Sequence, residues 1–331
     1  MKALVTGATG FIGAAVTRKL LARGYAVRAM ARTDSDKRNL ADLDVELAIA
    51  DLREPDSLTK AVQGIQLLFH VAADYRLWVP NPATMYETNV AGTRKLLLAA
   101  MDAGVEQIVY TSSVATLGIP PNGQPGREDT PTSIENMVGP YKRSKFMAEE
   151  VVRNMANTEH CPVVIVNPST PIGPGDIKPT PTGRVILDAV NGRIPAFVDT
   201  GLNIVHVDDV AQGHLLALDK GRVGEHYVLG SEDMSLEVLL GKVARLVGRR
   251  APRIRIPLPL AMGVAHVTEA WARISGSQPQ VTLDAVRMAR KKMYFSSDKA
   301  MQELGYEPRS GDLAIADAVA WFQDWDQSHD S

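Results

Sequence analysis

The sequence predicts an α/β protein in which a doubly wound parallel sheet, a Rossmann fold, carries a smaller C-terminal substrate-binding region. Two observations predict this architecture. The first half of the chain alternates short apolar segments with segments of helical periodicity, which is the pattern of βαβ units. The glycine-rich stretch TGATGFIG, residues 6–13, stands between the first apolar segment and the first helical one. A length of 331 residues accommodates one large domain or two unequal ones.

The first half of the chain supplies most of the expected sheet. Short apolar runs predict strands at 3–6, 27–31, 45–50, 67–72, 107–112 and 163–167. Apolar residues that recur every three or four positions predict helices at 11–23, 56–62, 84–103 and 140–155. Gly24 and Gly104 follow two of these helices as C-terminal caps. Because strands alternate with helices, we expect a parallel sheet with helices on both faces.

In the second half of the chain, strands and helices no longer alternate regularly. Residues 167–183 hold five prolines and three glycines and are expected to form a loop. Later helices are expected at 236–247 and 261–274, and the apolar stretch 257–274 is interpreted as a helix of the substrate region rather than of a membrane. We assign residues 1–167 and about 203–229 to the NAD(P)-binding domain, and about 168–202 and 230–326 to the substrate-binding region. Residues 327–331 are expected to be a frayed tail.

Charge and composition exclude several classes of protein. The 36 lysines and arginines and 38 aspartates and glutamates give a net charge of −2, which leaves no basic excess for a nucleic-acid partner. The single cysteine, Cys161, excludes an internal disulfide and a cysteine-based zinc site. No apolar run approaches the length of a membrane span, and the chain opens with a strand and a turn instead of a signal peptide. We therefore expect a cytoplasmic protein.

The glycine-rich stretch carries the residues that a dinucleotide needs. Gly7 permits the tight turn, Gly10 lets the backbone approach a pyrophosphate, and Gly13 lets the helix lie close to the sheet. The N–H groups and the dipole at the start of the helix attract the phosphates. The cofactor contacts expected here are Gly7, Thr9, Gly10, Phe11 and Ile12.

The residues after the second strand indicate which dinucleotide binds. An NAD enzyme usually carries Asp or Glu there for the ribose 2′-hydroxyl. This chain has Arg32, whose guanidinium can pair with a 2′-phosphate, while Asp34 and Asp36 come later, in the loop. We therefore expect NADP, with NAD as the alternative. Asp51, after the third strand, is placed to receive the adenine amine, and Leu52 follows it in the cofactor site.

Tyr141 and Lys145 are four residues apart and share one face of the expected helix 140–155. A free tyrosine has a pKa of about 10, and a neighbouring cation lowers it. The pair can pass a proton to or from a carbinol oxygen while hydride moves, and Lys145 can also hold the nicotinamide ribose. Ser113, after the fifth strand, is assigned to hydrogen-bond the same oxygen; Ser112 is the competing choice, and Thr111 precedes them in the cofactor site.

Two further polar residues need separate consideration. Arg76, in the loop after the fourth strand, can bind an anionic substrate group or be a plain surface residue. His206 stands beside Asp208 and Asp209, but the spacing supplies no second histidine on the same face, so we expect no metal site.

The motifs together resemble the extended short-chain dehydrogenase/reductases, in the NAD-dependent epimerase/dehydratase family. TGATGFIG, the serines after the fifth strand and YKRSK carry the resemblance, and FHVAA, VHVDDV and LGYEP extend it over nearly the whole chain. GYAVRAMAR and YTSSVATLG are similar to the dihydroflavonol 4-reductase-like branch. HVAADYRLW, VNPSTPIGPGDIKPTPTGR and VDTGLNIVHVDDVAQGHLLAL resemble most of all the hopanoid-associated sugar epimerases.

The resemblance implies the fold, a nicotinamide cofactor and a catalytic site of Ser113, Tyr141 and Lys145. It implies that residues 71–73 contact the cofactor, that residues 168–170 line the nicotinamide carboxamide, and that a histidine lies near the substrate entrance. The residues concerned are Val71, Ala72, Ala73, Pro168, Thr170 and His206. The usual dimer of the superfamily implies that helices 84–103 and 140–155 pair in a homodimer.

Three functions are compatible with these residues. We expect an NADP(H)-dependent oxidoreductase that transfers hydride to or from a secondary alcohol or ketone carbon, similar to dihydroflavonol 4-reductase. The alternative is a hopanoid-associated sugar epimerase, which would act on a sugar or a hopanoid-linked polyol and return the hydride from a bound NAD(P). Residues 166–174 lack the tyrosine-phenylalanine-asparagine string typical of nucleotide-sugar epimerases, which argues against a UDP- or dTDP-sugar. A dinucleotide sensor without turnover is the third, but it would not need a proton donor.

Overall fold

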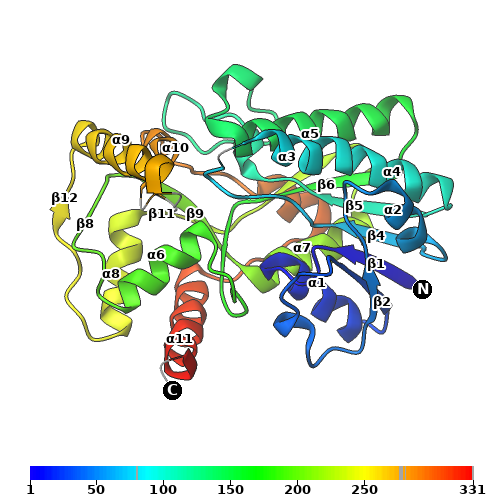
Figure 1. Ribbon diagram of the computed structural model, residues 1–331, viewed down its shortest axis with the longest axis horizontal. Helices are drawn as coiled ribbons and strands as arrows, with labels where there is room; N and C mark the ends of the chain where they lie inside the picture. Colours follow the sequence, from blue (N-terminus) through cyan, green and yellow to red (C-terminus); the bar gives the residue numbers. More distant parts are fainter. Residues whose placement is uncertain (80, 276–278, 280, 330–331) are drawn as a thin grey trace.

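A sheet of seven parallel strands forms the centre of the molecule (Figure 1). In the computed structural model, which describes residues 1–79, 81–275, 279 and 281–329, the strand order is β10-β6-β5-β4-β1-β2-β3. The strands are β1 (Lys2–Thr6), β2 (Ala26–Ala31), β3 (Glu46–Ile49), β4 (Leu67–His70), β5 (Gln107–Thr111), β6 (Val163–Pro168) and β10 (His226–Leu229). The direction of the strand order reverses at β1, between β4 and β2, and ligands of such sheets bind at the carboxyl ends of the strands there.

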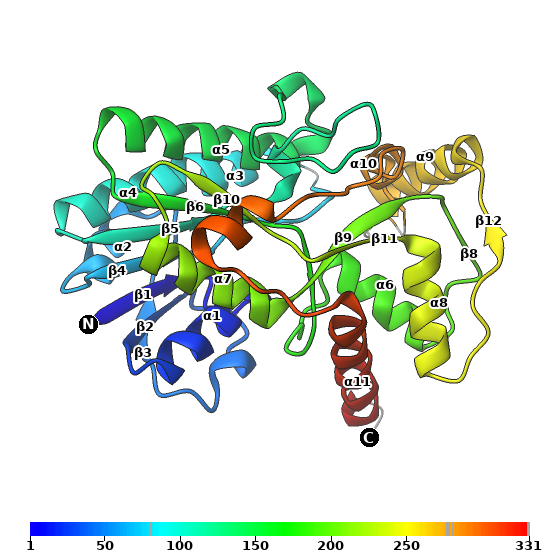
Figure 2. The same ribbon diagram turned by 180° about the vertical axis from the view of Figure 1, so that it is seen from behind.

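Helices cover both faces of this sheet. On one face α1 (Phe11–Ala22) packs against α7 (Val207–Lys220), as Figures 1 and 2 show. The other face carries α2 (Pro55–Val62), α4 (Thr93–Asp102) and α5 (Gly139–Thr158). Leu4 and Val5, successive residues of β1, belong to the two different apolar cores. Both faces of the sheet are therefore buried, which explains why the strands are almost continuously apolar.

A smaller region is built on the carboxyl side of the sheet. It has a three-stranded sheet in the order β11-β9-β7 and a short pair, β12-β8. Its strands are β7 (Thr170–Ile172), β8 (Ala196–Phe197), β9 (Gly201–His206), β11 (Glu232–Ser235) and β12 (Ile254–Arg255). Its helices are α6 (Pro181–Val190), α8 (Leu236–Leu246), α9 (Leu258–Ser275), α10 (Leu283–Met288) and α11 (Gly311–His329). The core of α6, α8 and α11 is separate from those of the large sheet.

The predicted fold class is confirmed, and two predicted elements are corrected. The expected loop 167–183 contains β7, which pairs with β9, and it ends inside α6. The expected single helix 84–103 consists of α3 (Ala83–Tyr86), a π-helical segment (Glu87–Gly92) and α4. Helical periodicity alone does not distinguish a π-helical turn from an α-helical one, and such turns are frequent at functional sites.

The division of the chain into two regions stays a prediction. Within the segment 203–229, α7 packs on the large sheet and β10 extends it, but β9 pairs with β7 and β11 in the smaller sheet. Helix α11 continues to His329, and residues 330–331 of the predicted tail lie outside the described residues. In the described part of the chain, no helix combines the length and apolar character needed to cross a membrane.

The turn before α1 generates the first testable prediction. A Cβ at Gly13 would lie 2.1 Å from the Gly7 carbonyl oxygen, so Gly13→Ala forces the helix away from the sheet. We expect it to lower the free energy of unfolding in urea by about 1–3 kcal/mol. The matched control is Gly241→Ala in α8, where an added Cβ would meet no heavy atom within 4 Å beyond its own chain neighbours and helix backbone. It should stabilise the protein by about 0.5–1 kcal/mol. Equal stability of Gly13→Ala and the wild type would contradict this account of the turn.

Candidate active site

The carboxyl ends of the strands bring the predicted site residues to one edge of the sheet. The glycine-rich turn follows β1, Arg32 follows β2, and residues 71–73 follow β4. Ser113 stands just beyond β5, and Pro168 ends β6. Since β6, β5, β4, β1 and β2 are neighbours in that order, these segments form a continuous row along the edge.

The glycine-rich turn has the geometry that the sequence predicts. Gly7 adopts a left-handed φ of 66°, and the Gly10 N–H donates to its carbonyl oxygen over 2.9 Å. A Cβ at Gly7 would lie 2.9 Å from the backbone of Ala72, so the turn lies directly against the end of β4. Helix α1 has Gly10 as its N-cap and no side-chain cap. Its first N–H groups are therefore left for an anion, and the turn fits a pyrophosphate.

The segments after β2 and β3 are charged and open. Arg32 exposes 61% of its side chain, and its guanidinium lies 3.6 Å from the Asp34 carboxylate. Asp36 pairs with Arg38 at 2.6 Å. The Asp51 carboxylate binds its neighbour Arg53 at 2.8 Å, which holds the pKa of Asp51 below its ordinary value. Arg32 is thus only loosely held, whereas Asp51 already has a cationic partner.

A buried chain of hydrogen bonds fixes the segment after β4. The Thr6 hydroxyl accepts the N–H groups of Val71 and Ala72, both over 3.1 Å, and lies 2.8 Å from His70 Nδ1. His70 Nε2 lies 2.9 Å from the Thr93 hydroxyl. Burial lowers the pKa of His70 to about 3, so the ring is neutral at pH 7. These bonds hold residues 71–73 against the glycine-rich turn.

Ser113 and Tyr141 meet at the end of β5. The Ser113 Oγ accepts the Ala115 N–H over 3.1 Å, which leaves its hydroxyl proton for Tyr141. The sequence predicted that the Lys145 cation lowers the pKa of Tyr141, but burial raises this pKa above its ordinary value of 10, and the opposing effect comes from the hydrogen bond with Ser113. At neutral pH Tyr141 is therefore protonated, as a proton donor must be.

Lys145 lies one turn further along α5 and is almost completely buried, with 3% of the residue exposed. Its ammonium donates to the Thr111 carbonyl over 2.8 Å and to the Tyr110 hydroxyl over 3.1 Å, and it lies over the Tyr110 ring. Burial lowers the pKa of Lys145 to about 8, although Glu149 opposes the shift. Desolvation thus weakens the hold of Lys145 on its proton, and the pKa is close to physiological pH.

Ser112, the competing choice for the catalytic serine, faces a different partner. Its hydroxyl donates to Glu149 Oε2 over 2.5 Å, and that buried oxygen also accepts Thr116 Oγ1 and Asn167 Nδ2 over 2.7 and 2.9 Å. Arg153 binds the other carboxylate oxygen at 2.8 Å. Burial alone would raise the pKa of Glu149, but these partners lower it overall, so the carboxylate is charged. Ser112 is thus engaged by Glu149, whereas Ser113 is the serine that contacts Tyr141.

Two residues proposed to meet the substrate are held by other groups. Arg76 binds Asp74 through two guanidinium nitrogens, at 2.9 and 2.5 Å, in an exposed pair. His206 is 1% exposed: its Nδ1 accepts the Asp208 N–H as the cap of α7, and its Nε2 lies 3.2 Å from Asp317. The structure therefore favours a helix cap for His206, because no free ring nitrogen is left for a substrate.

The structure adds polar residues that the sequence reasoning missed. Asn89, in the π-helical segment, accepts the Asp74 N–H and donates to the Asp74 carbonyl and to the Ser144 hydroxyl, which fastens the loop after β4 to α5. Asn167 donates to the Ser113 carbonyl over 3.1 Å. Asn167 could have been singled out, because it is the one polar residue at the end of the apolar run 163–167. The helical pattern around Asn89 gave no comparable indication.

The Glu149 contact generates a prediction on stability. Ser112→Ala removes a hydrogen bond to a buried carboxylate, so the free energy of unfolding should fall by about 1.5–3 kcal/mol in urea denaturation at pH 7. The control is Thr158→Ala, which removes an exposed hydroxyl at the end of α5, the helix that carries Glu149. It should change stability by less than about 0.5 kcal/mol. A Ser112→Ala protein as stable as the control would show that the serine does not hold Glu149.

Comparison with known proteins agrees with this geometry. The model of the NAD dependent epimerase/dehydratase family matches residues 3–230. A Synechocystis sp. protein provisionally named dihydroflavonol 4-reductase is 45% identical over 96% of this chain and 94% of its own. Sterol demethylase protein B of Methylococcus capsulatus is 37% identical over 98% of this chain and 99% of its own. The crystal structure of gox2253 aligns with 52% identity and a TM-score of 0.88 over 98% of both chains. The chain is therefore an enzyme of the NAD-dependent epimerase/dehydratase family, within the extended short-chain dehydrogenase/reductases.

Proposed function

We propose that the protein is an NADP(H)-dependent reductase that converts a ketone carbon of a small molecule to a secondary alcohol. The observation that carries this proposal is the contact of Ser113 with a protonated Tyr141 at the edge of the sheet that also holds the glycine-rich turn. A carbonyl oxygen placed between the two hydroxyl groups would accept hydrogen bonds from both. The provisional name of the Synechocystis relative, dihydroflavonol 4-reductase, supports this reaction class.

In this mechanism the side chains of the protein handle the proton. The nicotinamide supplies the hydride. Ser113 orients the carbonyl oxygen, and Tyr141 donates its phenolic proton as negative charge develops there. Lys145, charged at pH 7, stabilises the phenolate that remains. Since the pKa of Lys145 is about 8, this assistance fades as the pH rises through that value.

The residues at the sheet edge are suited to hold the dinucleotide. The uncapped start of α1, with Gly7, Thr9, Gly10, Phe11 and Ile12 around it, would bind the pyrophosphate. Arg32 would bind a 2′-phosphate, and Asp51 with Leu52 would lie at the adenine. The remaining contacts assigned to the cofactor are Val71, Ala72, Ala73, Thr111, Tyr141, Lys145, Pro168 and Thr170. Among the described residues, Lys145 has two hydrogen-bond acceptors for its three N–H groups, which leaves one for the ribose.

The second candidate is epimerisation, in which hydride is lent and returned on one substrate. The family description includes epimerases, and the same three residues serve both reactions, because each passes through a ketone. Arg32 after β2 favours net reduction, since NADP(H) normally leaves after each turnover. A sugar or hopanoid-linked polyol as the substrate, a homodimer and a cytoplasmic location stay predictions. Arg76 remains a proposed substrate contact only if its pair with Asp74 opens.

Removal of the phenolic proton tests the assigned chemistry. Tyr141→Phe keeps the ring but cannot donate, so turnover of a dihydroflavonol with NADPH should fall at least ~100-fold. NADPH binding, measured by fluorescence titration, should change little because the glycine-rich turn and Lys145 remain.

Two further variants separate a chemical effect from a structural one. Ser113→Ala should also lower turnover at least ~100-fold, whereas Ser112→Ala should keep most of it despite its lower stability. Comparable turnover in Tyr141→Phe and the wild type would remove Tyr141 from the mechanism.

The cofactor preference depends on Arg32. Loss of a charge-assisted contact should raise the Kd of NADPH roughly tenfold to a hundredfold in Arg32→Ala and leave the Kd of NADH unchanged. Arg94→Ala is the control and should change neither, because it removes an arginine at the start of α4 that pairs with Glu159, just after α5. If the wild type binds NADH as tightly as NADPH, the assignment to NADP is wrong.

A further inference from the structure

Helix α9 leaves an apolar face uncovered. Five of its large apolar residues follow one another at intervals of four and three, which places them on one side of the helix. They expose between 46% and 81% of their surface and form what we name the α9 face: Leu260, Val264, Val267, Trp271 and Ile274. The opposite side of the helix packs Ala261 and Ala265 against Val286 of α10. Monomeric proteins rarely expose a continuous apolar strip of this kind, so the α9 face is a candidate interaction surface.

The chain segment that contains α9 is strongly one-sided in charge. Residues 249–292 hold nine lysines and arginines and two carboxylates, whereas the whole chain carries a net charge of −2. The basic residues are Arg249, Arg250, Arg253, Arg255, Arg273, Arg287, Arg290, Lys291 and Lys292. Of the two carboxylates, Glu269 is buried and accepts the Leu283 N–H over 2.7 Å, and Asp284 pairs with Arg287 at 3.3 Å. Arg255 pairs with Glu237 of α8, outside this segment. The unpaired basic residues of this segment therefore favour an anionic partner.

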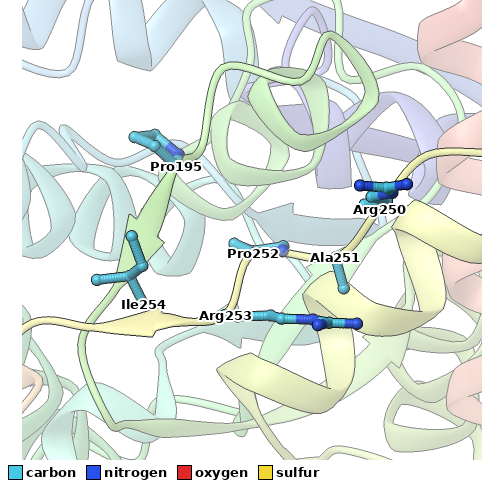
Figure 3. Close-up of a pocket in the computed structure, with 6 residues that line it drawn as sticks. All are labelled: Pro195, Arg250, Ala251, Pro252, Arg253 and Ile254. Atoms are coloured by element: carbon cyan, nitrogen blue, oxygen red, sulfur yellow. The ribbon is translucent and has the colours of Figure 1, made fainter.

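The segment before α9, residues 250–254, lines a cavity that contains two arginines. The cavity has a volume of about 640 Å³ and is also lined by Pro195 of the smaller region. Figure 3 shows the side chains of Arg250 and Arg253 directed to the same side of this segment, away from Ile254. Both arginines are exposed, and no hydrogen bond or ion pair within the described residues engages their guanidinium groups. They are free to bind anionic headgroups.

The position of α9 connects this surface to the active site. Figures 1 and 2 show α9, α10 and β12 together at the end of the molecule opposite the N-terminus. Helix α10 packs on α9 and also reaches the start of α5: a Cβ at Gly139 would lie 2.4 Å from the Asp284 carboxylate. Gly139 stands two residues before Tyr141. A surface bound to α9 would thus be one short helix away from the proton donor.

The sequence favoured a helix of the substrate region over a membrane helix, but the exposure of the α9 face changes that interpretation. We propose that the α9 face and the basic residues of the segment 249–292 bind the surface of a membrane that contains anionic phospholipids. Helix α9 would lie in the plane of the interface, with its apolar residues among the acyl chains and the arginines at the headgroups. A second copy of the chain is a poorer occupant, because a two-fold axis through this face would bring like charges together. This proposal concerns binding only, so it stands or falls separately from the proposed reductase activity.

Cosedimentation of the full chain with vesicles tests the proposal. The wild type should sediment with vesicles of phosphatidylcholine and phosphatidylglycerol, and less with phosphatidylcholine alone. Val267→Ser/Trp271→Ser should weaken the partition at least about tenfold by removing apolar area. Arg250→Gln/Arg253→Gln should weaken it about tenfold or more, and added salt should weaken wild-type binding.

Matched substitutions elsewhere control for general effects. Val223→Ser removes an exposed apolar residue between α7 and β10, and Lys60→Gln removes an exposed charge on α2; neither should change the partition. Thermal unfolding and NADPH titration should be the same for all variants, which shows that they fold. The proposal is overturned if the wild type does not sediment with anionic vesicles or if the α9 variants bind as it does. Sedimentation velocity that shows a dimer broken by Val267→Ser/Trp271→Ser would assign the face to a second copy instead.

Discussion

The site depends on one buried carboxylate, that of Glu149. It accepts hydrogen bonds from Ser112 just after β5 and from Asn167 in β6, while its own helix α5 carries Lys145 one turn earlier and Tyr141 two turns earlier. Asn167 in turn donates to the Ser113 carbonyl. The carboxylate thus joins the ends of two strands to the helix that faces them. The meeting of Ser113 with Tyr141 is a consequence of this junction, because neither strand end nor helix can shift without breaking a bond to a buried charge.

A buried charge of this kind is tolerated because its partners are arranged around it. Arg153, one turn further along α5, binds the carboxylate at 2.8 Å. His226 lies 3.6 Å away, but burial lowers its pKa to about 4, so it is neutral at pH 7 and Arg153 supplies the compensating charge. Glu149 also raises the pKa of Lys145 against the effect of burial. The same carboxylate therefore positions the site and keeps its cation charged near neutral pH.

The fold and the chemical groups of the site were predictable from local patterns. Alternation of strands and helices, the glycine-rich turn and the spacing of Tyr141 and Lys145 are all short-range features of the sequence. The contacts of Glu149 with Ser112 and Asn167 span 37 and 18 residues, and no single segment contains such a pattern. His206 shows the converse: the family resemblance placed it near the substrate entrance, yet its ring caps α7 and lies 3.2 Å from Asp317. The exposure of α9 also could not be predicted, because apolar periodicity marks a face without saying what covers it.

In the proposed reduction, the hydride is transferred permanently from the cofactor to the product while Tyr141 supplies the proton. NADPH deuterated at the transferable position of the nicotinamide, incubated with a dihydroflavonol and the wild-type protein, tests this claim most directly. A reductase places one deuterium in the product for each NADPH consumed, as mass spectrometry and absorbance would show together. Tightly held NAD in the purified protein, with inversion of a sugar carbon and no loss of NADPH, would contradict the claim and assign the site to epimerisation.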